Sequence, residues 1–333
     1  MQTTIVAPAA SDAPVQPAGA GAMARPARTY RIGDVTVTRI DELTLDGSSQ
    51  AALYLGSDPA ALERHRDRFG PGSIQAGTGN LIQSIHSWLL RTPRHTILVD
   101  TATGNDKHRP DAPMLDQLHE PYLARLAAAG VRPEAVDYVL LTHLHADHVG
   151  WNTRRVDGRW VPTFRNARHV FSNIEQAYNE ALADGRTPDA EARPGPALGR
   201  MVRTPSPGVY DDSVRPVIEA GLADLIPIDG QEFLDGLSFL RTPGHSIDHA
   251  SIRLVSQGQE ALFVGDVMHH PLQVYEPDLT SRYCEFPQAG LGSRLWALEQ
   301  AADRAATVFT SHFAETSAGR VTRAGGRFAW HFV

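Results

Sequence analysis

Cysteine, long apolar runs and an N-terminal positive charge are all scarce in this sequence. Its one cysteine, Cys284, cannot form an intrachain disulfide. No apolar run approaches the roughly 20 residues that a membrane-spanning helix needs. The first basic residue is Arg25, so the N-terminus lacks the positively charged region of a secretory signal peptide. These features predict a soluble, cytoplasmic protein with no membrane partner.

The charge balance does not favour a polyanionic partner. Lys and Arg number 31 against 38 Asp and Glu, which gives a formal net charge of −7. Proteins that bind nucleic acids or anionic membranes typically carry basic patches. We therefore expect no nucleic-acid partner and predict that the protein acts on a small molecule.

The composition indicates one folded part preceded by an unusual N-terminal segment. The 333 residues are 42% hydrophobic and 21% charged, as in ordinary globular proteins. Residues 1–28 are rich in Ala and Pro, so burial cannot offset the entropy lost on ordering them. We predict that this segment is disordered. Residues 45–80 mix Gly and Asp around a short helical stretch and are interpreted as a long, partly helical insertion.

Strand and helix patterns interleave along the rest of the chain, which is typical of a layered α/β protein. Five prolines within residues 184–209 predict a mobile loop. The predicted strands are 35–38, 82–90, 95–100, 137–143, 168–172, 237–242, 250–256, 260–266 and 306–312, and the predicted helices are 121–130, 173–183 and 291–305.

Several of the 15 histidines cluster in residues 142–150, which read THLHADHVG. His143 and His145 lie two positions apart, so an extended chain points both to one side. Asp147 and His148 follow in a loop that can turn them toward a second point. Imidazole and carboxylate are the ligands that Zn²⁺ and similar ions prefer. Four ligands are too many for one ion and too few for two, so further ligands are expected downstream.

Suitable residues follow three later strands. His245 ends the segment TPGH, Asp266 ends ALFVGD, and His312 ends TVFTSH. A single histidine after a strand is more often structural than a ligand. However, five histidines and two aspartates after four predicted strands favour a metal site, because loops at strand ends gather functional groups.

With these elements in order, the sequence resembles the metallo-β-lactamase superfamily, whose HxHxDH motif stands here as HLHADH. The resemblance runs from about Tyr30 to Val333 and implies a single α/β domain, residues 29–333, folded as a four-layered αββα sandwich. It also implies two divalent metal ions per chain, with zinc as the expected ion, at one edge of the paired sheets. By resemblance, His143, His145 and His245 hold the first ion, Asp147, His148 and His312 hold the second, and Asp266 bridges the two.

Within the superfamily the sequence is most similar to the lactonase and methyl parathion hydrolase branch. The bridging Asp266 and the tail SHFAETSAGRVTRAGGRFAW carry this likeness, and the insertion at 45–80 resembles the lid of that branch. Class B β-lactamases lack the bridging Asp, and the B1 type has a Cys ligand there. Cys284 lies 18 residues past Asp266, so it is interpreted as a small buried residue rather than a ligand. This argues against antibiotic hydrolysis.

The resemblance implies a hydrolase in which a hydroxide bridging the two ions attacks the substrate. Asp147 either shuttles a proton to the leaving group or only binds metal. His269 stands where lactonases often place a Tyr, so it either acts on the substrate as a donor or acid or forms part of the pocket wall. His270 is expected to be structural or exposed.

Other residues are candidates for support of the site. Asp100, in LVDTATG, either orients a ligand imidazole or stabilises a turn. His249 either lies behind the site or is an ordinary core or surface residue. Five apolar residues near the ligands are each expected in the core, although as a group they could line an apolar pocket and suggest a hydrophobic substrate: Trp151, Met268, Leu272, Tyr275 and Phe286.

The leading hypothesis is a metal-dependent hydrolase of a hydrophobic lactone, carboxylic ester or organophosphate triester. One alternative is a thioesterase resembling glyoxalase II, although the basic residues that bind glutathione are not found here. Another is a non-catalytic ligand-binding member of the fold, although none of the seven ligands is missing. A nuclease is disfavoured by the acidic charge balance. A homodimer is expected by analogy with the family.

Overall fold

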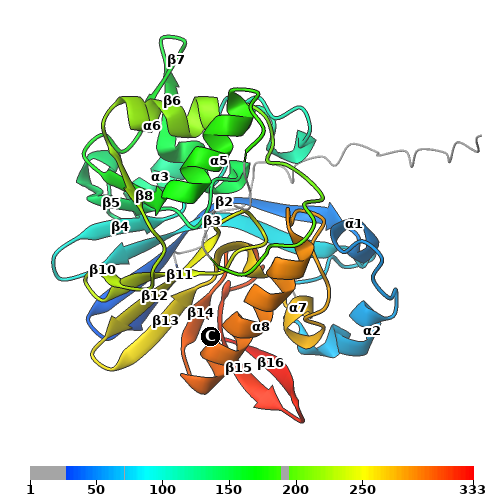
Figure 1. Cartoon of the computed structure of the whole chain (residues 1–333). Helices are drawn as coiled ribbons and strands as arrows, with labels where there is room; N and C mark the ends of the chain where they lie inside the picture. Colours follow the sequence, from blue (N-terminus) through cyan, green and yellow to red (C-terminus); the bar gives the residue numbers. More distant parts are fainter. Residues whose placement is uncertain (1–27, 71, 189–194) are drawn as a thin grey trace, which may run out of the picture.

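The computed structural model describes residues 28–70, 72–188 and 195–333. The N-terminal segment for which we predict disorder therefore lies outside the described residues, except for Arg28. The described chain contains two large sheets and one hairpin (Figure 1).

The first sheet has seven strands in the order β1-β2-β3-β4-β5-β8-β9. Neighbouring strands are antiparallel from β1 to β4 and parallel from β4 to β9. The bounds are β1 (Thr29–Ile32), β2 (Val35–Ser48), β3 (Leu81–Arg91), β4 (Thr96–Val99), β5 (Tyr138–Leu140), β8 (Arg168–Ser172) and β9 (Ala223–Ile226).

The second sheet also has seven strands, in sequential order from β10 to β16. Only the β13–β14 pair is parallel among its strands. The bounds are β10 (Glu232–Leu234), β11 (Leu237–Arg241), β12 (Ala250–Ser256), β13 (Gln259–Phe263), β14 (Thr307–Phe309), β15 (Ala318–Ala324) and β16 (Arg327–Phe332).

Helices cover the outer faces of both sheets (Figure 1). On the first sheet, α3 packs against β2, and α5 packs against β8 and β9. On the second sheet, α8 packs against β15 and α7 against β16. The helices are α1 (Gln50–Leu53), α2 (Ala61–His65), α3 (Tyr122–Ala128), α4 (Ala146–Val149), α5 (Asn173–Ala183), α6 (Arg215–Glu219), α7 (Leu272–Tyr275) and α8 (Pro287–Asp303).

Side chains that point alternately to the two faces of a strand produce the layered arrangement of the cores. In β3, Trp88 and Leu90 face a core shared with the second sheet, whereas Leu89 faces the core beneath α3. Successive strand residues point to opposite faces, so one strand supplies both cores. A further apolar cluster lies between the second sheet and α8. The predicted αββα sandwich is therefore confirmed.

The predicted strands and helices match observed elements, with some differences at their bounds. Helix α8 begins at Pro287, four residues before its predicted start, because proline is well accommodated in the first helical turn. Residues 45–48, which we assigned to the insertion, instead complete β2 and pair with β3. The rest of the insertion contains α1, α2 and the short 3₁₀ helix Arg66–Arg68. A lid role for it stays a prediction.

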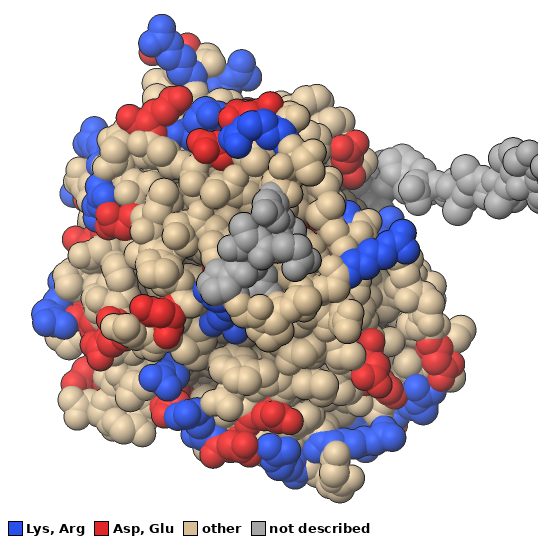
Figure 2. Space-filling model, viewed as in Figure 1, with Lys and Arg blue, Asp and Glu red and all other residues tan. Residues whose placement is uncertain are grey.

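The sequence analysis did not predict the hairpin of β6 (Thr153–Val156) and β7 (Arg159–Pro162). Its turn residues, Asp157 and Gly158, both have positive φ angles, of 48° and 77°. Asp-Gly is a strong sequence signal for such a turn. The hairpin projects from the body of the molecule and carries exposed arginines (Figures 1 and 2). Elsewhere on the face in Figure 2, basic and acidic side chains are interspersed.

The proline-rich segment contains no helix or strand over residues 184–188 and 195–208. Its residue Val202 donates a backbone hydrogen bond to the carbonyl of Glu285 at 2.8 Å. Among the helices of the described ranges, none is long and apolar enough to cross a membrane.

A close backbone contact fixes the end of the histidine motif. A Cβ atom added at Gly150 would lie 1.7 Å from the carbonyl oxygen of Thr103 and 1.9 Å from its carbonyl carbon. The backbone N–H of Gly150 also donates to the carbonyl of Ala102 at 2.7 Å. Only glycine allows this approach, which packs the motif against the loop after β4.

We therefore expect Gly150→Ala to destabilise the protein by about 1–3 kcal/mol or more, because the new methyl group meets backbone atoms. The matched control is Gly292→Ala, at an exposed position in α8 with open space around it. Alanine there should stabilise by up to about 1 kcal/mol. Urea unfolding followed by circular dichroism measures both changes, and equal stabilities of Gly150→Ala and wild type would contradict the packing argument.

Candidate metal centre

The residues of the HLHADH motif follow the end of β5, which runs to Leu140. His143 lies in the loop, His145 is the N-cap residue of α4, and Asp147 and His148 lie within α4. The change from extended loop to helix turns Asp147 and His148 away from the line of the first two histidines. The predicted division of the motif into two pairs is therefore what the backbone produces.

The later residues reach the same edge from the second sheet. His245 follows β11, Asp266 lies in the 3₁₀ helix Gly265–Val267 after β13, and His312 follows β14. The structure brings all seven predicted side chains together in overlapping groups whose possible ligand atoms lie within 4.8 Å of one another. The first group is His143, His145 and His245, and the second group is Asp147, His148 and His312. A further group between them is His143, His148 and Asp266.

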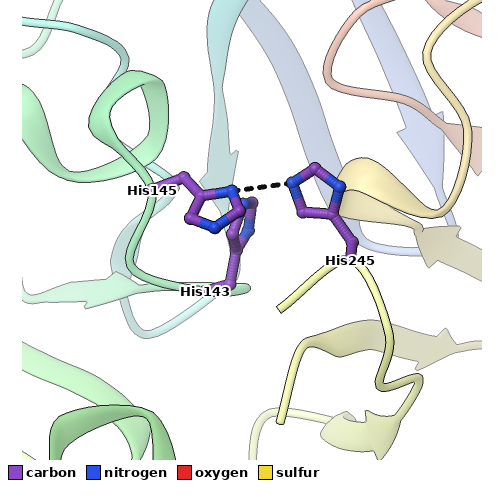
Figure 3. A group of neighbouring side chains, drawn as sticks. All are labelled: His143, His145 and His245. Carbon is purple, nitrogen blue, oxygen red and sulfur yellow. Dashed lines mark hydrogen bonds between the residues drawn. The ribbon is translucent and has the colours of Figure 1, made fainter. Parts of the chain in front are cut away.

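The first group consists of three imidazoles turned toward one another (Figure 3). The Nδ1 atom of His145 lies 2.8 Å from the Nε2 atom of His245. The Nε2 atom of His143 is buried and has no hydrogen-bond partner among the described residues. A buried polar atom without a partner is costly, so its place among other ligand atoms fits a metal ion. Imidazole and carboxylate donors suit zinc and similar divalent ions.

Asp266 connects the two halves of the site. One carboxylate oxygen lies 3.0 Å from Nε2 of His148. The other lies 3.2 Å from Nε2 of His245 and 3.0 Å from Nε2 of His312. This position between both groups is the one that a bridging ligand requires. That these residues bind metal stays a prediction.

Burial and charge favour the cation-binding protonation states of Asp266, His143 and His245. Burial raises the pKa of Asp266, but His148, His312 and His245 outweigh it and hold the pKa well below its usual range. Burial lowers the pKa of His143 and His245 well below that of a free histidine. Asp266 is therefore ionised and these two imidazoles are neutral, which are the forms that coordinate metal. At His148 and His312, burial lowers the pKa, but Asp266 and Asp147 outweigh it and raise the pKa, so these two imidazoles release a proton when a cation binds.

Asp100 supports the second group, in agreement with one of its two expected roles, the orientation of a ligand imidazole. Its Oδ2 atom lies 2.9 Å from Nδ1 of His148, and its Oδ1 atom accepts from the backbone N–H of Thr142 at 2.8 Å. On the same side, Nδ1 of His312 donates to the carbonyl of Ser84 at 3.0 Å. Such partners fix the orientation of ligand imidazoles.

His249 lies behind the site and is fully buried. Its Nε2 atom accepts from the backbone N–H of Asp266 at 3.0 Å, and its Nδ1 atom lies 2.9 Å from the hydroxyl of Thr242. Burial, only partly opposed by Asp266, lowers its pKa to about 3, so the ring stays neutral and accepts this bond. His249 therefore helps to hold the backbone that carries Asp266.

His269 lies within the centre, as predicted. Its Nε2 atom is 3.3 Å from Oδ2 of Asp266, and its ring stacks on His312 with the centroids 5.4 Å apart. With His245 and Asp266 it forms a fourth group of ligand-type atoms. His270 is structural, as expected: it is buried, and its Nε2 donates to the carbonyl of Ser73 at 2.9 Å.

The apolar residues near the motifs are core residues rather than a pocket wall. Trp151 stacks on Tyr122 and donates to Glu42, and Phe286 packs near Tyr178. All five have at most 5% of their surface exposed: Trp151, Met268, Leu272, Tyr275 and Phe286. The expectation of core packing is confirmed for each, and the collective inference of an apolar pocket built from them is wrong.

A depression with a volume of about 440 Å³ lies on the insertion. Arg66, Phe69 and Gln75 are among its lining residues, and none of the seven predicted ligands is.

Sequence reasoning missed two residues beside the centre. Glu285 is fully buried, and its Oε1 atom lies 2.7 Å from Nε2 of His145. Tyr283 lies against His269, with the ring centroids 6.2 Å apart. Neither belongs to a spaced motif, and Glu285 is 140 residues from His145 in sequence. The one sequence signal for Glu285 was its position as an acidic residue between Cys284 and Phe286, both of which are buried.

Comparison with known proteins agrees with this architecture. The model of the metallo-beta-lactamase superfamily matches residues 83–312, and the chain therefore belongs to this superfamily. The comparison with curated proteins gave no match.

Several solved structures share the fold. A hydrolase of the beta lactamase superfamily, AbOPH, has a TM-score of 0.71 at 22% identity, covering 93% of this chain and 98% of that one. The dizinc quorum-quenching lactonase AidC has a TM-score of 0.67 at 19% identity, with coverages of 92% and 97%. A probable metal-dependent hydrolase from Staphylococcus aureus has a TM-score of 0.65 at 19% identity, with coverages of 91% and 99%.

Asp100→Asn tests the support of His148. The backbone of Asp100 has a φ angle of 57°, which asparagine tolerates, so the change removes the charge with little strain. We expect metal affinity to fall about 10–100-fold, because the imidazole loses its carboxylate partner. The control is Asp106→Asn, at an exposed residue with a φ angle of 61°. Isothermal titration measures the Zn²⁺ affinity of both variants and of wild type. If Asp100→Asn binds Zn²⁺ as tightly as the control does, Asp100 only stabilises its turn.

Proposed function

We propose that the protein is a dinuclear metal-dependent hydrolase of a hydrophobic lactone, carboxylic ester or organophosphate triester, with zinc as the metal. The observation that carries the proposal is the place of Asp266, whose two oxygens face imidazoles of both groups. The seven ligand-type residues His143, His145, Asp147, His148, His245, Asp266 and His312 would hold the two ions.

Two divalent ions in such a centre lower the pKa of a water molecule toward neutrality and polarise the oxygen of the scissile group. The contribution of the chain is to hold the imidazoles in fixed orientations through Asp100, Ser84 and Glu285. Because these contacts are buried, the ligands need little rearrangement when substrate arrives. No protein side chain has to act as the nucleophile.

Asp147 is suited to exchange protons with solvent. Its side chain is 20% exposed, whereas those of His148 and Asp266 are 1% and 4% exposed. Its Oδ2 atom lies 3.5 Å from Nε2 of His312. We therefore assign Asp147 both a ligand role in the second group and transfer of a proton to the leaving group.

We assign His269 the donation of a hydrogen bond to the substrate. Burial lowers its pKa, with Asp266 opposing, so the ring is neutral and carries one N–H at pH 7. A neutral imidazole of this kind donates a hydrogen bond more readily than it releases a proton. Its neighbour Tyr283, which Arg203 approaches at 5.6 Å from the ring centroid, gives this side of the centre an aromatic surface.

The choice of substrate class is supported by the fold relatives and by this aromatic side. One relative is described as a quorum-quenching lactonase in complex with the product N-hexanoyl-homoserine. An aromatic residue beside a metal centre favours apolar or aryl groups over charged ones. The substrate tests therefore start from lactones and aryl esters.

Asp266→Ala tests the dinuclear centre. We expect the wild-type protein to bind two metal ions per chain and the variant to bind at most one, because the only carboxylate shared by both groups is lost. Turnover should fall at least 10³-fold for every substrate that the wild type hydrolyses, an estimate from the several kcal/mol that such ions supply. Metal analysis and one substrate panel measure both.

The panel contains an acyl-homoserine lactone, a γ-lactone, an aryl ester, methyl parathion and a glutathione thioester. Turnover of the thioester alone would favour a thioesterase over the proposed activity. Two bound ions without turnover of any substrate would favour a ligand-binding member of the fold. Activity that survives Asp266→Ala would contradict the dinuclear mechanism.

His269→Phe tests the donor role, since phenylalanine keeps a planar ring and removes both nitrogens. We expect kcat to fall about 100-fold with the metal content unchanged, as for the loss of a positioned donor. If only KM changes, His269 is part of the pocket wall and the donor role is wrong. Metal analysis of the variant separates a lost donor from a lost ligand.

A further inference from the structure

Glu285 is a buried carboxylate that touches two residues of the first histidine group. Its Oε1 atom lies 2.7 Å from Nε2 of His145, and its backbone N–H donates to the carbonyl of His245 at 3.0 Å. The Glu285 side chain has no exposed surface, and that of His145 is only 13% exposed. Solvent therefore does little to weaken their contact.

We propose that Glu285 is a positioning residue of the first metal subsite, made of His143, His145 and His245. It fixes the His145 ring so that Nδ1 is the ligand atom, and it supplies a negative charge to a subsite whose other members are imidazoles. The inference rests on the proposed metal centre and goes beyond it by assigning a residue outside the seven ligands.

The two ring nitrogens of His145 have different surroundings. Nε2 faces the carboxylate of Glu285, whereas Nδ1 faces Nε2 of His245 at 2.8 Å (Figure 3). The carboxylate oxygen at 2.7 Å accepts a hydrogen bond from Nε2, so this nitrogen carries a proton. The lone pair is then on Nδ1, which points into the first group. A carboxylate behind a ligand imidazole fixes its tautomer and raises its basicity.

The second group has the same arrangement. Asp100 stands behind His148 at 2.9 Å, as Glu285 stands behind His145. Each group therefore has one imidazole backed by a carboxylate. Together with Asp147 and Asp266, these two carboxylates place four acidic side chains around the predicted positions of two divalent cations.

The backbone around Glu285 is held independently of its side chain. Phe286 donates a backbone hydrogen bond to the carbonyl of Gly244 at 2.8 Å. The carbonyl of Glu285 itself accepts from the backbone N–H of Val202 at 2.8 Å. A substitution that changes only the carboxyl group should therefore leave this segment in place.

Zn²⁺ titration against a competing chelator tests the proposal, with metal-free wild type and Glu285→Gln. We expect one of the two ions to bind about 10–100-fold more weakly to the variant, because the amide keeps the shape and removes the charge. Circular dichroism of the metal-free proteins should be the same. The readout is metal affinity, so it does not depend on knowing the substrate.

Glu175→Gln is the matched control. Glu175 is also fully buried, and it accepts from the hydroxyl of Ser246 and from the backbone N–H of Asp248 at 2.8 Å, neither of which belongs to the seven ligands. Burial, with a further effect of Glu285, raises its pKa to about 8. Since Glu175 is then mostly protonated at pH 7, glutamine replaces it with little change in charge. Both ions should bind this variant as they bind wild type.

The outcomes separate the inference from the proposed function. If wild type binds two ions and Glu285→Gln binds both equally tightly, the positioning role is wrong and the metal centre stands. If wild type binds no zinc, the proposed function fails and the inference with it. Glu285→Asp provides a second test should the glutamine variant not fold. Aspartate keeps the charge on a shorter side chain, so this variant should weaken the binding of one ion less than the glutamine variant does. Wild-type zinc affinity of the aspartate variant would overturn the proposal.

Discussion

Burial of the Asp266 carboxylate depends on three imidazole nitrogens that lie 3.0–3.2 Å from its oxygens. A carboxylate removed from water is strongly disfavoured unless it is paired and hydrogen-bonded. The imidazoles of His148, His245 and His312 make that pairing, and they come from chain segments following different strands. Among the described residues, Nε2 of His143, Nε2 of His148 and Oδ1 of Asp266 still have no hydrogen-bond partner. A cluster of this composition is costly as a purely structural feature and becomes favourable when it holds cations.

The two sheets bring these residues together because the loops after β5, β11, β13 and β14 meet at one edge of the sandwich. The backbone of Gly150 lies against that of Thr103, which packs the loop after β5 on the loop after β4. Asp100 and Glu285 then orient one imidazole in each group from behind. Three features therefore form the centre: the strand ends bring the ligand-type residues together, the Gly150 contact packs the histidine motif, and the buried carboxylates orient the imidazoles.

Most of the strands could be predicted, and the seven ligand-type residues proposed, because their signals are local, whereas the αββα arrangement was implied by the resemblance to the superfamily. Strands such as β12 alternate or run apolar, and each predicted ligand follows such a strand. Glu285 could not be found in this way, since its partner His145 is distant in sequence and no spacing relates them. The apolar residues near the motifs were misjudged as a group, because nearness in sequence does not show which face of an element is buried. Tyr283 instead lies beside His269.

The most direct test of the central claim is the anomalous diffraction of crystals of the full chain grown with zinc, measured on both sides of the zinc absorption edge. The account predicts two anomalous peaks per chain, one on each side of Asp266, with the first beside Nδ1 of His145. A single peak, or zinc bound only at sites away from Asp266, would contradict the dinuclear centre.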